Sequence, residues 1–287
     1  MHPENIHNES YDFDTLSKAH NELKKFVILN NHQTKSIDFS NPEAVLHLNK
    51  ALLKHHYKIT DWNLPDNYLC PPIPGRVDYI HVLNDLLTSD EILKDIKGLD
   101  IGVGANCIYP ILGSQIYNWE MVGADIDQVA VKSAQSNVKL TKNLAKNIEI
   151  RLQNDNANIF QGVIKDKEYY HFTMCNPPFH SSKEEATKGT LRKLKSLHDS
   201  ESLELNFGGQ SNELWCNGGE ALFIKRMIKQ SVQFKTQVGW FTTLASKKEN
   251  LPKLIKQLDK LKTTHHVIKM SQGNKKSRII AWKFNEY

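Results

Sequence analysis

The feature that most constrains the fold of this chain is a repeated alternation of short apolar segments and amphipathic helical segments that begins at Lys97. Strands that alternate with helices predict a parallel α/β sheet covered by helices on both faces. Strands are expected over 98–101, 121–126, 148–152, 171–175 and 238–244, and helices over 129–140, 221–234 and 251–261.

The last two expected strands, 266–270 and 278–284, differ from the others because no helix separates them. The segment between them contains Gly273 and Asn274. A Gly-Asn turn between two apolar runs indicates an antiparallel hairpin. The sequence therefore predicts a mostly parallel sheet that ends in a hairpin.

The part before residue 90 has a different pattern. Residues 1–35 have no firm period and are expected to be a partly ordered extension. Residues 42–59 predict a helix, since Asn41 can cap its start and Pro42 suits its first position. Three prolines predict an extended loop over 64–76, and a second helix is expected over 79–87.

These patterns divide the chain into an N-terminal helical extension, 1–90, which is a candidate for RNA binding, and an α/β domain, 91–287. A length of 287 residues suits one large domain with an appendage. The segment at about 181–219 is long for a single connection, and long glycine-containing loops are often lids or binding loops. We therefore expect it to be an insertion that shapes a substrate site.

The composition excludes some classes of protein. No apolar run is long enough to span a bilayer, and the first residues contain no apolar signal-peptide core, so a cytoplasmic protein without a membrane segment is expected. The four cysteines form no C-x-x-C pair, so no metal site is expected and the thiols should be free.

A glycine-containing turn follows the first expected strand, in the segment Leu99–Asn106. In an open α/β sheet, ligands bind beyond the carboxyl ends of the strands. Gly102 and Gly104 would let the backbone turn tightly and approach a ligand. The pattern is not the G-x-G-x-x-G of dinucleotide folds, because the third glycine is absent.

An acidic residue ends the second expected strand. Asp125 could accept hydrogen bonds from both hydroxyls of a ribose, as acidic residues at this position do in related nucleotide folds. Asp127 fits the alternative role of capping the next helix. Asp100 together with the two glycines and Asp125 resembles the fingerprint of S-adenosylmethionine binding, although a plain strand-to-helix turn is the alternative.

The tetrapeptide Asn176-Pro177-Pro178-Phe179 follows the fourth expected strand. Two prolines stiffen the loop and remove two N–H donors, leaving the Asn176 side-chain oxygen and the Pro177 carbonyl as acceptors. Two acceptors can hold an amino group and turn its lone pair toward a methyl donor, so positioning and electrostatics carry the catalysis. Phe179 offers a face on which a flipped base can stack.

This tetrapeptide is shared by methyltransferases that modify adenine, cytosine or glutamine amino nitrogens. It therefore indicates the reaction and not the substrate. The structural alternative is a Pro-Pro turn with Asn176 as a local cap and Phe179 in the core.

The net charge of +5 permits nucleic-acid binding without requiring it. Two basic clusters are candidates for phosphate contacts, and ordinary solvated faces are the alternative. The candidates for RNA binding are Lys188, Arg192 and Lys193 in the insertion, and Lys275, Lys276 and Arg278 near the terminal hairpin.

Five segments together resemble the RlmF family of bacterial 23S ribosomal RNA adenine-N6 methyltransferases. They cover residues 70–87, 99–113, 174–182, 205–228 and 272–284. The resemblance implies a class I, Rossmann-like methyltransferase fold. It also implies transfer of one methyl group from S-adenosylmethionine to N6 of one adenine in 23S ribosomal RNA or a large-subunit precursor, by a monomer that needs no metal.

The resemblance also implies roles for individual residues. Arg76 would contact the methionine carboxylate of the cofactor, a contact for which a guanidinium is suited. Asp125 would hold the ribose, and the segment 153–156, with Asn154 as the candidate, would contact the cofactor adenine. Further cofactor contacts are assigned to Asp100, Gly102, Gly104 and Asn106, and catalysis to Asn176, Pro177, Pro178 and Phe179.

Two other functions remain open from the sequence. A protein glutamine-N5 methyltransferase would use the same tetrapeptide on a release-factor peptide. A non-catalytic RNA-binding assembly factor would keep the fold but would not transfer a methyl group.

Overall fold

The computed structural model describes residues 1–141, 143–178, 218–272 and 275–285. Its central feature is a seven-stranded sheet in the order β5-β4-β3-β6-β7-β9-β8, in which β9 runs opposite to the other six strands. This arrangement confirms the predicted parallel sheet with a terminal hairpin. The strands are β3 (Lys97–Ile101), β4 (Glu120–Asp125), β5 (Ile148–Leu152), β6 (Tyr170–Cys175), β7 (Val238–Ala245), β8 (Thr264–Gln272) and β9 (Lys275–Lys283).

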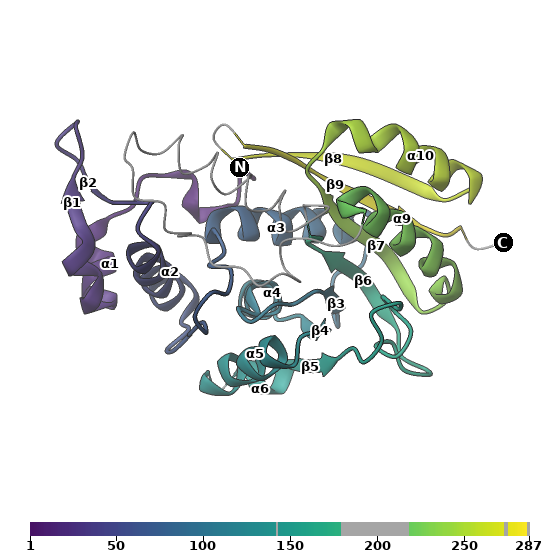
Figure 1. Ribbon diagram of the computed structural model, residues 1–287, viewed down its shortest axis with the longest axis horizontal. Coiled ribbons are helices and arrows are strands. Elements are labelled where there is room, and N and C mark those ends of the chain that lie inside the picture. The colour runs from purple at the N-terminus through teal and green to yellow at the C-terminus, as the bar shows by residue number, and fades with distance from the viewer. Residues whose placement is uncertain (142, 179–217, 273–274, 286–287) are drawn as a thin grey trace.

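Helices cover both faces of this sheet (Figure 1). One buried cluster joins helices on one face to Phe172 and Met174 of β6. The other joins Leu99 of β3 to Ile224 and Leu254 on the opposite face. The helices that follow β3 are α4 (Ile108–Tyr117), α5 (Gln128–Leu140), α6 (Leu144–Asn147), α9 (Gly219–Ser231) and α10 (Leu251–Lys260).

The N-terminal residues are packed, so the expectation of a partly ordered extension over 1–35 was wrong. Phe13, Leu16 and Leu23 are buried in the same cluster as one face of the sheet. The elements there are too short to show a period, since each contributes only a few apolar side chains. They are the 3₁₀ turns Ile6–Asn8 and Asn21–Phe26, α1 (Phe13–Ala19), and a hairpin of β1 (Val27–Leu29) and β2 (Lys35–Ile37).

Helix α2 (Pro42–Tyr57) confirms the predicted cap, since Asn41 accepts hydrogen bonds from the first-turn amides. Helix α3 (Ile73–Ser89) begins earlier than predicted, within the expected loop 64–76. A proline in the first helical turn costs nothing, because its missing N–H would have no helical partner there. Arg76 is therefore carried by a helix rather than by a loop.

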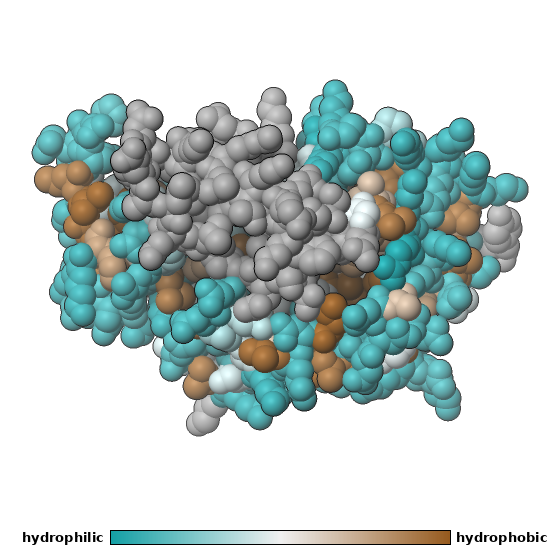
Figure 2. Space-filling view, viewed as in Figure 1, coloured by the Kyte–Doolittle hydropathy of each residue, from teal (hydrophilic) through white to brown (hydrophobic). Residues whose placement is uncertain are grey.

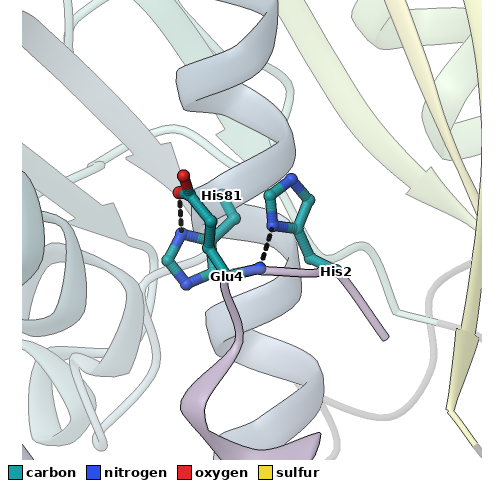
Figure 3. A group of neighbouring side chains, drawn as sticks. All are labelled: His2, Glu4 and His81. Atoms are coloured by element: carbon teal, nitrogen blue, oxygen red, sulfur yellow. Dashed lines mark hydrogen bonds and ion pairs between the residues drawn. The ribbon is translucent and has the colours of Figure 1, made fainter.

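The first residues of the chain fold back onto α3 (Figure 3). The His2 and His81 rings stack with their centroids 5.0 Å apart, and His2 Nε2 lies 2.8 Å from the Asp85 carboxylate. His2, Glu4 and His81 have ligand-type atoms within 4.8 Å of one another. The lone pairs of two stacked rings lie side by side and do not converge on one point, as the ligands of a metal ion would. We therefore interpret the group as a hydrogen-bonded contact between the start of the chain and α3.

Three further features concern the composition and the surface. In the part of the chain that the structure describes, no helix is both long enough and apolar enough to cross a membrane. Cys107 and Cys175 are buried and Cys70 is partly buried, whereas Cys216 lies outside the described residues. The described surface in Figure 2 is mostly hydrophilic with scattered apolar side chains.

Candidate functional site

A cavity of about 440 Å³ opens at the carboxyl ends of β3, β4 and β6. This is the edge of an open α/β sheet at which ligands bind, and the volume is within the range of small-molecule sites. The cavity brings together groups from distant parts of the chain. Among its lining residues are the predicted Arg76, Gly102, Gly104, Asn106, Asp125, Asn176 and Pro178.

The turn after β3 and the end of β4 hold each other in place. The Asp125 carboxylate accepts hydrogen bonds from the backbone N–H groups of Gly104 and Asp127, each at 2.9 Å. Gly102 has a φ of +75°, and a Cβ there would meet no atom within 4 Å, so the backbone itself borders open space. Asp127 caps α5 by accepting from Val129 N, as its sequence position indicated.

Asp100 is the most unusual charged group beside the cavity. Its side chain is buried, and neither carboxylate oxygen has a hydrogen-bond partner among the described residues. Burial first, and then repulsion by Asp125, raise its pKa to about 8, while Arg76 opposes the shift. A buried carboxyl without partners is costly unless something else supplies them.

Arg76 extends from the first turn of α3 toward the end of β6. Its Nη1 donates to the Tyr109 hydroxyl at 2.6 Å, and the guanidinium lies over the Tyr109 ring. With the Asn176 carboxamide oriented so that its oxygen accepts, that oxygen lies 3.1 Å from Nη1 and 3.2 Å from Nη2. The buried Arg76 Nε has no partner among the described residues.

The loop after β5 borders the cavity, partly through the predicted segment 153–156 but not through Asn154, the candidate within it. Gln153, Asn156 and Asn158 line it. Asn154 is exposed and does not line the cavity, so its assigned contact with the cofactor adenine stays a prediction without support from its position.

Two side chains of α9 fix this loop, and the sequence analysis did not identify them. Arg226 Nη2 donates to the carbonyls of Asn156 and Ala157, at 3.1 and 2.9 Å. Gln230 donates to Ala157 O at 2.8 Å and accepts from Ile159 N at 2.7 Å. The only sequence signal was a pair of polar residues four positions apart on an amphipathic helix.

Asn176 and Pro177 follow directly after β6, which ends at Cys175. Asn176 is partly buried and borders the cavity, whereas Pro177 is buried. Phe179, the last residue of the predicted catalytic tetrapeptide, lies outside the described residues.

The predicted RNA contacts are only partly described. Lys188, Arg192 and Lys193 lie outside the described residues, as does the predicted insertion apart from its last two positions. Arg278 of β9 is opposite Ala245, the last residue of β7, so it lies at the same edge of the sheet as the cavity. The backbone of Lys275 and Lys276 continues β9 beyond that point.

Comparisons with known proteins identify the family of this chain. A family model described as RNA methyltransferase matches residues 1–286. Ribosomal RNA large subunit methyltransferase F of Christiangramia forsetii is 62% identical over 285 residues, covering 99% of this chain and 100% of its own. The protein of the same name from Cytophaga hutchinsonii is 52% identical, covering 99% of this chain and 91% of its own.

Two solved structures share the fold over the whole chain. The N-terminal domain of human METTL16 in complex with SAH has a TM-score of 0.80 at 26% identity, covering 100% of this chain and 99% of that one. The hMettl16 catalytic domain in complex with the MAT2A 3′UTR hairpin 6 has a TM-score of 0.84 at 28% identity, covering 100% and 98%. The chain therefore has the class I methyltransferase fold and belongs to the RNA methyltransferase family, among the ribosomal RNA large subunit methyltransferase F proteins.

Proposed function

We propose that this chain transfers a methyl group from S-adenosylmethionine to N6 of one adenine in 23S ribosomal RNA or a large-subunit precursor, as a cytoplasmic monomer. One observation carries the proposal. The Asn176 carboxamide, an acceptor for an amino group, opens onto the same cavity as Arg76 and Asp125, which suit a nucleoside joined to an amino acid.

The residues around the cavity fit S-adenosylmethionine group by group. Arg76 has a buried Nε–H that pairs with none of the described residues, which suits a carboxylate. Asp100 has two buried oxygens that no described residue contacts by a hydrogen bond, which suit an ammonium group. Asp125 keeps acceptor capacity beyond its two backbone hydrogen bonds, which suits the ribose hydroxyls.

The bound sulfonium supplies the methyl group, so the protein has to position the acceptor nitrogen. The Asn176 oxygen and the Pro177 carbonyl would each accept a hydrogen bond from one N–H of the adenine amino group. Both acceptors follow β6 directly, so the rigid sheet limits their movement. Positioning of this kind, together with electrostatic stabilisation, lets the nitrogen attack without prior removal of a proton. As the C–N bond forms and the C–S bond breaks, the nitrogen releases one proton to solvent.

RNA is supported as the substrate by the charge at the edge of the cavity and by the relatives. Arg278 lies opposite Lys269 on the terminal hairpin, next to the end of β7. Lys247 and Lys248 follow that end after Ser246. Cationic side chains at this edge are suited to phosphate contacts beside the reacting base.

The test offers methyl-labelled S-adenosylmethionine with deproteinised 23S ribosomal RNA, assembled large subunits or a release-factor protein. We expect N6-methyladenosine at one position of the RNA after digestion. Methylglutamine in the release factor would contradict the proposal in favour of the glutamine methyltransferase. No methylated product from any substrate, with RNA binding retained, would contradict it in favour of the assembly factor.

We expect Asn176→Ala to lower the rate of methyl transfer by about 100- to 1000-fold or more, because the variant lacks one acceptor for the amino group. The affinity for S-adenosylhomocysteine, measured by calorimetry, should change little. Ser246→Ala, which alters a hydroxyl directed at Glu220, is the control and should keep activity near wild type. Near-normal turnover by Asn176→Ala would refute the assigned role.

A further inference from the structure

The contact between Arg76 and Asn176 links the two halves of the site. Resting on the proposed function, we propose that Arg76 blocks the acceptor oxygen of Asn176 until a carboxylate-bearing cofactor engages the guanidinium. The enzyme would then hold the adenine amino group well only after the cofactor has bound. Arg76 is in this view a positioning residue for the substrate as well as a cofactor ligand.

The geometry shows why the two roles compete. With the Asn176 carboxamide oriented so that its oxygen accepts, both terminal nitrogens of Arg76 lie near that oxygen, at 3.1 and 3.2 Å. A carbonyl oxygen has two lone pairs, and a forked guanidinium directed at it takes up the directions that an incoming N–H would use. A cation against the oxygen also draws electron density from it, which makes it a weaker acceptor for the adenine amino group.

The surroundings of Arg76 leave its guanidinium able to bind a carboxylate. Its Nη1 is held by the Tyr109 hydroxyl, while the buried Nε has no partner among the described residues. Asp100 interacts favourably with Arg76 by charge, yet its oxygens make no hydrogen bond to it. A carboxylate in the cavity would therefore gain a charge-assisted, two-point contact that no described acidic residue already occupies.

The consequence is a coupling between ligands, which must be reciprocal. If the carboxylate of the cofactor frees the Asn176 oxygen, the adenine-bearing RNA must bind more tightly in its presence. The adenine-bearing RNA must in turn strengthen binding of the carboxylate-bearing cofactor by the same factor. A ligand that fills the nucleoside part of the cavity and lacks the carboxylate should leave Asn176 blocked.

The experiment compares S-adenosylhomocysteine with 5′-methylthioadenosine, which lacks the amino-acid part. Each is added at saturation, and the affinity for a fragment of 23S ribosomal RNA containing the methylated adenine is measured. The same fragment with purine at that position lacks the amino group and reports all other contacts. The adenine preference is the affinity for the adenine fragment divided by the affinity for the purine fragment. We expect this ratio to be about tenfold higher with S-adenosylhomocysteine than with 5′-methylthioadenosine.

Two variants locate the effect. Arg76→Met should remove the difference between the two ligands, even where higher ligand concentrations are needed for saturation. Arg226→Met is the matched control, because that arginine also lines the cavity but donates to the carbonyls of Asn156 and Ala157. It should weaken both ligands and keep the difference.

Two results would overturn the inference. One is an equal effect of the two ligands on the adenine preference of the wild-type protein, which needs no variant to observe. The other is a difference that survives in Arg76→Met. Either result, obtained with a protein that methylates the RNA, would leave the proposed function intact, whereas failure to methylate RNA at all would remove the function itself.

Discussion

At the scale of single residues, Asp100 shows what the sequence could and could not predict. Its place in the glycine-containing pattern identified it as a cofactor residue, because that pattern is local. The raised pKa of its carboxyl was not predictable, because it depends on burial and on Arg76 and Asp125, which other elements bring close. The contact between Arg76 and Asn176 was hidden for the same reason, because 100 positions separate the two residues.

The raised pKa of Asp100 predicts how stability depends on pH. The carboxyl has a pKa of 3.8 in the unfolded reference and about 8 in the native protein. Between these values the native state holds a proton that the unfolded chain releases, so stability falls as the pH rises through this range. Asp100→Asn should flatten that fall, giving a higher Tm than wild type at pH 8 and a similar Tm at pH 5.

Ligand binding should show the opposite trend. Ionised Asp100 attracts the ammonium group of S-adenosylhomocysteine, so the affinity of the wild-type protein should rise between pH 6 and 8, and Asp100→Asn should lose that rise. The exposed Asp166→Asn serves as the control for both measurements. Parallel pH profiles for wild type and Asp100→Asn would show that Asp100 does not titrate in this range.

At the scale of elements, prediction succeeded where a pattern is complete within one segment. The strand expected over 148–152 coincides with β5, and the helix expected over 129–140 differs from α5 by one residue. It failed where several short elements share one core, as in residues 1–35, and where Pro74 was taken to exclude a helix. The lateral order of the strands depends on packing between elements and has no local signal.

The start of α9 gives a prediction at this scale. Glu220 is buried and accepts hydrogen bonds from Ser246 N, Lys247 N and Asn250 Nδ2, at 2.7, 3.2 and 2.9 Å. It thereby fixes the loop that follows β7, which lies at the same edge of the sheet as the cavity. Glu220→Ala leaves these donors without their acceptor and should lower the free energy of unfolding by about 3 kcal/mol.

Glu220→Gln keeps one acceptor oxygen and should cost about half as much in denaturant titrations. The neighbouring Glu249→Ala, on the exposed side of the same loop, is the matched control and should change stability by less than about 0.5 kcal/mol. Equal stability of Glu220→Ala and wild type would show that the loop is held by other contacts.

At the scale of the whole molecule, the N-terminal residues take part in building the site. Asn5 is buried and donates to Pro74 O at 2.9 Å and to the Asp78 carboxylate at 2.6 Å, on either side of Arg76 in α3. One buried cluster also continues across the expected boundary at residue 90. The division into an extension and a methyltransferase domain remains a prediction, and an RNA-binding role of the extension is compatible with this support.

Asn5→Ala tests this support. The variant removes a donor to Pro74 O and to the Asp78 carboxylate, which keeps a hydrogen bond from His2 N, so the free energy of unfolding should fall by about 1–3 kcal/mol. Because α3 carries Arg76, the affinity for S-adenosylhomocysteine should fall several-fold, while the affinity for 5′-methylthioadenosine should change less. The exposed Glu9→Ala is the control. Loss of stability with unchanged ligand affinity would show that the first turn of α3 holds Arg76 without help.

The early start of α3 has a consequence for exchanging parts between related enzymes. A chimera that joins the first 60 residues of one relative to the remainder of another would pair one protein's Asn5 with the other's Pro74 and Asp78. Such a hybrid could keep every glycine of the cofactor turn and the whole catalytic tetrapeptide and still hold its methyl donor poorly. The useful crossover point therefore lies after α3, beyond Ser89, so that the beginning of the chain and the arginine it supports are inherited together.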